Sequence, residues 1–88
     1  MKHKTRACII VRERVLETLN KGEYPNGKEF KIYIVACSYI LGCEKYWIST
    51  DLPDGKYFEV TYNAQTDEYY LDEYVRIYNR AVKGAENG

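Results

Sequence analysis

Residues 28–42, KEFKIYIVACSYILG, combine strand-like alternation with apolar side chains in both alternating sets. In an extended chain, one face would carry Phe30, Ile32, Ile34, Ala36 and Ile40, and the other would carry Tyr33, Val35, Cys37 and Tyr39. A strand that is apolar on both faces is usually central in its sheet, or has another element packed on its second face. This segment therefore constrains the fold more than any other part of the chain.

Two shorter strands and a hairpin are predicted downstream. Residues 44–50 form a second strand, and the loop DLPDG at 51–55 carries the proline and Asp-Gly signals of a turn. Residues 56–63 form a third strand, and the AQT linker leads to a fourth at 67–71. In an antiparallel hairpin Tyr62 would then lie opposite Tyr69, and Val60 opposite Leu71.

The N-terminal part of the chain predicts a helix over residues 6–21. Thr5 is suited to the N-cap and Gly22 to the C-terminal stop. At 100° per residue, one stripe of this helix carries Cys8, Val11, Val15 and Leu19. A turn is expected at residues 23–29, where Pro25 precedes an Asn-Gly pair.

Residues 72–83 fit two templates. As a strand continuing from Leu71, the odd positions include Glu73 and Asn79, so only three of five are apolar. As a helix, most apolar residues fall within about 120° of arc, and Asp72 and Glu73 stand at the positive end of its dipole. The helix is favoured, and a four-stranded antiparallel meander without it remains the alternative.

The predicted fold is one α+β domain over residues 1–88, with an N-terminal helix, an antiparallel sheet of three to four strands and a C-terminal helix. The longest mostly apolar run, at 32–43, is too short to span a membrane. The N-terminal apolar patch is too short for a secretory signal, so a cytoplasmic chain is expected. Cys8, Cys37 and Cys43 are expected to be reduced thiols, with no metal or other cofactor.

An enzyme is not expected. The single histidine, His3, has no evident orienting partner near the N-terminus, and the glycines form no phosphate-binding loop. The adjacent acids Asp67-Glu68 and Asp72-Glu73 would point to opposite faces of a strand.

Charge and tyrosine content instead indicate a binding surface. Between Glu44 and Glu73 there are eight acids and only two lysines, and the chain holds ten tyrosines. Such a field attracts basic partners. The predicted partner-binding residues are Asp51, Asp54, Tyr57, Glu59, Asp67, Glu68, Tyr70 and Asp72. A face for a homodimer or a ligand is predicted at Tyr33, Val35, Tyr39 and Trp47.

Two functions follow from these residues. The first is an inhibitor or adaptor that docks its acidic, tyrosine-rich surface onto a basic, nucleic-acid-binding protein. Small inhibitors from phages and mobile elements, including anti-CRISPR and other anti-defence proteins, have this size and lack of motifs, although the analogy is one of type only. The alternative is a module that stacks single-stranded nucleic acid or a nucleotide on its aromatic sheet face.

Overall fold

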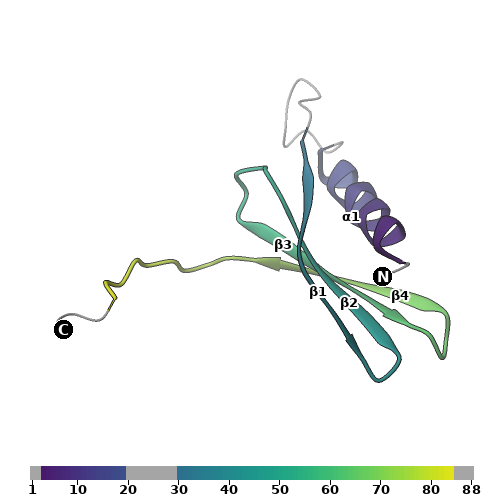
Figure 1. The fold of residues 1–88 in the computed structure, drawn as a ribbon. Coiled ribbons are helices and arrows are strands. Elements are labelled where there is room, and N and C mark those ends of the chain that lie inside the picture. The colour runs from purple at the N-terminus through teal and green to yellow at the C-terminus, as the bar shows by residue number, and fades with distance from the viewer. Residues whose placement is uncertain (1–2, 20–29, 85–88) are drawn as a thin grey trace.

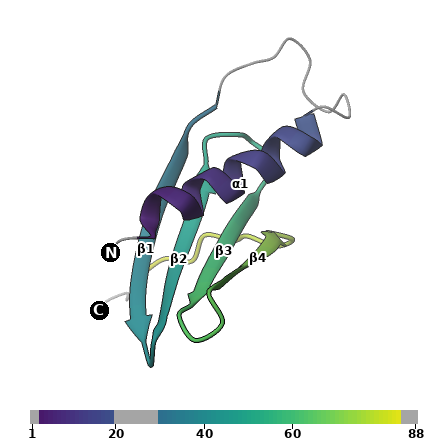
Figure 2. The same ribbon diagram turned by 90° about the vertical axis from the view of Figure 1, so that its right-hand side faces the viewer.

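The protein is a single helix packed on a four-stranded sheet, as described by a computed structural model that covers residues 3–19 and 30–84. The elements are α1 (Lys4–Thr18), β1 (Ile32–Ile40), β2 (Cys43–Thr50), β3 (Lys56–Asn63) and β4 (Glu68–Val75). The strands form an antiparallel meander in the order β1-β2-β3-β4 (Figure 1). Helix α1 lies across one face of this sheet (Figure 2).

The register of the β3–β4 hairpin is the one that alternation predicted. Tyr62 pairs with Tyr69, and Val60 pairs with Leu71. The predicted third strand has its observed bounds, and the loop before it contains Gly55 at a φ of 70°, in the left-handed region that glycine favours. These elements are confirmed.

The hydrophobic core lies between α1 and the two central strands. Ala7, Val11 and Val15 recur every four residues, so they share one side of the helix, and all three are buried. They pack in one cluster with the buried side chains Phe30, Tyr46, Ile48, Leu52, Phe58 and Val60. Cys8, expected on the apolar stripe of the helix, is at the margin of the core and only partly buried.

The start of α1 differs from the prediction. The helix begins at Lys4, so Thr5 lies inside it, and His3 occupies the N-cap without a side-chain capping bond. The ring of His3 stacks on Tyr62 with centroids 3.7 Å apart, and its Nδ1 lies 2.6 Å from the hydroxyl oxygen of Tyr69. His3 therefore has the orienting partners that the sequence did not reveal. The predicted helix end at residues 21–22 and the turn at 23–29 lie outside the described residues.

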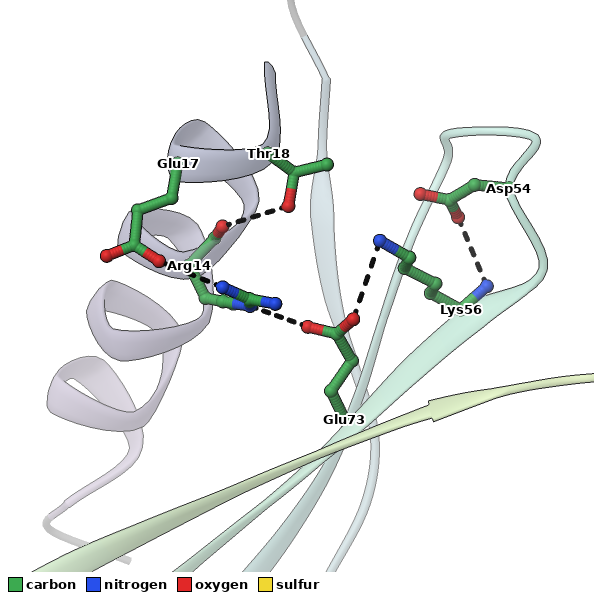
Figure 3. Close-up of polar contacts among 6 residues, drawn as sticks. All are labelled: Arg14, Glu17, Thr18, Asp54, Lys56 and Glu73. Carbon is green, nitrogen blue, oxygen red and sulfur yellow. Dashed lines mark hydrogen bonds and ion pairs between the residues drawn. The ribbon is translucent and has the colours of Figure 1, made fainter. Parts of the chain in front are cut away.

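The predicted C-terminal helix over residues 72–83 is wrong. Strand β4 continues to Val75, which pairs with Lys56, and residues 76–84 form neither helix nor strand. Glu73, which seemed to break the strand pattern, faces α1 and is held there: Arg14 Nε donates a 2.7 Å hydrogen bond to it, and Lys56 Nζ lies 3.4 Å from its second oxygen (Figure 3). The alternative, a helix followed by a four-stranded meander, is the observed fold.

Strand β1 also departs from expectation, because it is an edge strand. A bulge places Val35 and Ala36 together opposite Trp47. Beyond the bulge the faces are exchanged: Cys37 pairs with the core residue Tyr46, and Tyr39 pairs with Glu44. Cys37 and Tyr39 therefore lie on the α1 side of the sheet, away from Tyr33, and both are exposed rather than part of the core.

Within residues 3–19 and 30–84, no helix is long and apolar enough to cross a membrane.

Candidate functional site

The face of the sheet that points away from α1, here called the open face, is covered by no other described element (Figure 2). Residues that pair across neighbouring strands share a face, so the register gives its composition. Its rows, from β1 to β4, are Tyr33-Ser49-Tyr57-Tyr74, then Val35/Ala36-Trp47-Glu59-Asp72, then Ser38-Lys45-Thr61-Tyr70, then Ile40-Cys43-Asn63-Glu68.

The open face is unusually aromatic and apolar for a surface in contact with water. Its exposed large side chains are Tyr33, Val35, Ile40, Tyr57, Tyr70 and Tyr74. Two hollows flank Trp47, one lined in part by Val35 and Tyr57, the other by Ile40 and Thr61. Contiguous apolar surface of this kind marks interaction sites more often than it stays bare.

Of the eight acids in the region, seven already have intramolecular partners and one, Asp72, has none among the described residues. The seven are Glu44, Asp51, Asp54, Glu59, Asp67, Glu68 and Glu73, each of which accepts a hydrogen bond from a side chain or backbone group. Asp72 is exposed and has no hydrogen bond or ion pair with any other described residue. Its charge is therefore the one most available to a partner.

Asp72 has tyrosine side chains as its neighbours on the open face. Tyr70 and Tyr74 lie two residues away on the same side of β4, and Glu59 is its direct partner on β3. Tyr57 and Tyr74 stack with centroids 4.9 Å apart. The charge of Glu59, followed by burial and the charge of Asp72, raises the pKa of Tyr74, so the local field is negative. We call this set, Tyr57, Glu59, Tyr70, Asp72 and Tyr74, the Asp72 patch.

Glu59 and Asp72 are like charges placed directly across two strands, an arrangement that is unfavourable without a counter-charge. Two residues of β2 stabilise the charge of Glu59. Trp47 Nε1 donates a 3.0 Å hydrogen bond to it, and Lys45 Nζ lies 3.4 Å from its other oxygen. Asp72 has no such partner within residues 3–19 and 30–84. A cation brought by a partner would complete the pairing, and the neighbouring tyrosine rings could stack on a guanidinium group.

Three of the predicted partner-binding acids lie outside the open face, and each accepts a hydrogen bond from the protein itself. Asp51 accepts a hydrogen bond from the Lys31 backbone N–H, and Asp54 accepts one from that of Lys56 (Figure 3). Asp67, in the β3–β4 turn at a φ of 54°, accepts a 2.7 Å hydrogen bond from the Tyr62 hydroxyl. The structure brings together Tyr57, Glu59, Tyr70 and Asp72, with Glu68 at the end of the face.

Three of the four residues predicted for a dimer or ligand face lie on one face of the sheet. Tyr33, Val35 and Trp47 lie on the open face, whereas Tyr39 is removed from it by the bulge. Tyr74 belongs to the face but was predicted to be helical, so alternation extended past Leu71 would have been the signal that finds it.

A second polar cluster lies at the start of α1, around His3, Tyr62, Tyr69 and Asp67. The hydrogen bond to Asp67, followed by burial, raises the pKa of Tyr62 to about 12. All of these contacts are internal and fasten the N-terminus to the sheet. Among the described residues no group of three or more His, Cys, Asp or Glu side chains could hold a metal ion.

A protein-family model described as "Family of unknown function (DUF6275)" matches residues 5–84. No curated protein and no solved structure matches the chain.

Proposed function

The chain belongs to the DUF6275 family, whose function is unknown, and we propose that it is a non-enzymatic binding protein that docks its open face onto a basic surface of another protein. The observation that carries this proposal is the exposed Asp72, which lies among tyrosines on the open face and has no charged or hydrogen-bonding partner in the described part of the chain. An inhibitor or adaptor of a nucleic-acid-binding protein is the class that this surface suits, because such proteins present large basic grooves.

Three features support a protein partner. Tyrosine and tryptophan contribute large contact area with few rotatable bonds and are enriched at interface hot spots. The hollows beside Trp47 can receive apolar side chains. The negative field of Glu59 and Asp72 favours an arginine or lysine at the centre of the contact.

Single-stranded nucleic acid is the second candidate, because Trp47 and the Tyr57–Tyr74 stack offer flat rings on one face. The lysines argue against it. Lys45, on the open face, pairs with Glu59, and Lys56 pairs with Glu73 on the α1 side. Phosphates arriving at the open face would meet Asp72 and Glu59, which repel them.

Affinity capture with three versions of the full chain tests the proposal. The variants are Asp72→Lys and a matched control, Glu13→Lys, which makes the same charge change on an exposed position of α1. Neither substitution disturbs the core, and Asp72→Lys places a cation opposite Glu59. Captured proteins are identified, purified and measured for direct binding at low and high salt.

The proposal expects basic proteins that bind the wild type and Glu13→Lys, bind Asp72→Lys at least about tenfold more weakly, and dissociate as salt rises. Capture that is identical for all three chains would exclude the Asp72 patch. Salt-sensitive binding of single-stranded oligonucleotides, strengthened by Asp72→Lys, would favour the second candidate.

A further inference from the structure

The segment that follows β4, residues 76–84, here called the arm, runs away from the domain on the side of the sheet opposite α1 (Figures 1 and 2). All of its residues are exposed. Ile77 is 93% exposed and Val82 73% exposed, and Tyr78 is also largely in solvent. A stretch of nine residues that leaves three large apolar side chains in water gains free energy if another surface covers them.

The arm and the open face are complementary. The arm contains Arg76, Arg80 and Lys83 and no acid, so it carries three positive charges. The open face presents Asp72, Glu59 and Glu68 among exposed rings. One surface is therefore basic and apolar, and the other acidic and aromatic, which is the pairing that favours association.

The arm is not placed to fold back onto the sheet of its own chain. Its first residue is fastened to the neighbouring loop, because the backbone N–H of Arg76 donates a 2.9 Å hydrogen bond to the carbonyl of Gly55. Residues 76–83 contain no glycine or proline, the residues that most readily reverse a chain. The arm is long enough for another sheet, since nine extended residues reach about 30 Å and four strands span roughly 15 Å.

We propose that the open face is covered by the arm of a second copy of this chain, and that two copies exchange arms in a symmetric homodimer. Ile77 and Val82 of one copy enter the apolar surface around Trp47 of the other, and the basic side chains approach Asp72 and Glu68. The exchange also covers Tyr33, Val35 and Ile40, which β1 exposes on the open face. This inference uses the same open face as the proposed function, so a basic partner protein would have to displace the arm, but the dimer itself does not depend on such a partner.

Sedimentation equilibrium of the purified full chain, with no partner present, tests the inference. The wild type is expected to reach twice its 10.4 kDa mass in a concentration-dependent manner. Ile77→Asp on the arm and Asp72→Lys on the face are each expected to weaken dimerisation about tenfold or more. Their controls are Ile9→Asp, the same substitution at an exposed position of α1, and Glu13→Lys on the same helix; both are expected to dimerise normally.

Carbodiimide coupling of a mixture of isotopically light and heavy chains tests the exchange itself. This reagent joins a lysine amine to a nearby carboxylate, so the inference expects links between Lys83 of one chain and Asp72 or Glu68 of the other. A chain that stays monomeric at millimolar concentration overturns the inference. A dimer unaffected by Ile77→Asp, or links of Lys83 only within its own chain, overturns it equally. None of these results depends on whether the protein captures a basic partner.

Discussion

Arg14 of α1 and Glu73 of β4 are joined across the helix–sheet interface by a 2.7 Å hydrogen bond from Nε to Oε1 (Figure 3). The two residues are 59 positions apart in the chain. Lys56 approaches the other oxygen of Glu73, and Glu17 accepts a 3.0 Å bond from Arg14. This network keeps an acid on the covered side of the sheet and joins the helix to β4.

The first prediction concerns the stability that this network supplies. Glu73→Gln removes the charge that Arg14 and Lys56 share and is expected to lower the free energy of unfolding by about 1–2 kcal/mol, since Arg14 is partly screened by solvent. Glu17→Gln is the control, because that carboxylate is exposed, and its effect is expected to be about 0.5 kcal/mol or less. Urea denaturation at neutral pH measures both.

The same network sets an acid-dependent loss of stability. The hydrogen bond from Arg14, with the charges of Lys56 and Arg14, lowers the pKa of Glu73 below its ordinary value of 4.5, against the opposing effect of burial. The contribution is therefore complete above pH 4.5 and disappears as the pH falls through the lower pKa of the folded state. The stability difference between wild type and Glu73→Gln should shrink over that range. A difference that stays constant into acid would show that the pair is not responsible.

Glu73 also explains why part of the fold could not be predicted from the sequence. Alternation placed Val60 opposite Leu71 correctly, because both side chains are apolar and the pattern is local. Two residues further along the chain, the acid Glu73 falls on the core side of the pattern and therefore counted against a strand. Its partner Arg14 lies in the first helix, and no local pattern reveals that contact. Residues 72–83 do have helical periodicity, but residues 72–75 pair with β3 instead of forming a helix.

The bulge in β1 was invisible for a different reason. Bulges are recognised when a polar residue appears on the wrong face, but residues 32–37 are apolar on both faces. The sequence pattern therefore did not show that the two faces exchange at Val35, and Tyr39 was assigned to the wrong face of the sheet. Composition records the charges of Asp51, Asp54 and Asp67 but not the backbone or hydroxyl group that forms a hydrogen bond with each of them.

The second prediction concerns the alkaline titration of Tyr62. Its folded-state pKa of about 12 lies above the ordinary value of 10, chiefly because Asp67 accepts the hydrogen bond of the neutral phenol. The stability it contributes is complete below pH 10 and lost as the pH rises through 12. Asp67→Asn keeps an acceptor and tolerates the positive φ but removes the charge, so Tyr62 is expected to ionise at lower pH. Tyrosinate absorption, assigned by comparison with Tyr62→Phe, measures the shift, and an unchanged curve would contradict it.

The third prediction is a coupling energy within the Asp72 patch. Tyr57 and Tyr74 stack on the open face, and a double-mutant cycle to alanine is expected to give a coupling of about 0.5–1.5 kcal/mol. Tyr57 and Tyr70 form the control pair, because they are two cross-strand rows apart, and their effects should add. Additivity in both cycles would mean that the rings do not stack in solution.

The fourth prediction uses the cysteines to report on helix packing. Burial raises the pKa of Cys8, partly offset by Lys4, whereas Cys37 is exposed. Because the thiolate is the reactive form, iodoacetamide at neutral pH is expected to alkylate Cys37 well before Cys8. Peptide mapping by mass spectrometry gives the order. Equal rates would indicate that α1 leaves the sheet on the timescale of labelling.

The last prediction is a substitution that stabilises the protein. Leu41 and Gly42 form the two-residue turn between β1 and β2 with φ values of 49° and 81°, as in the hairpin turn that favours Asn-Gly. Leucine is strained in that conformation, and its side chain is 96% exposed, so it gains little from packing. Leu41→Asn is expected to raise the free energy of unfolding by about 0.5–1 kcal/mol, and Leu41→Val, which is β-branched, is expected to lower it. Urea midpoints compare the three chains. A lower midpoint for Leu41→Asn would show that this leucine makes a stabilising contact, and the apolar tip of the β1–β2 hairpin would then belong to an interface.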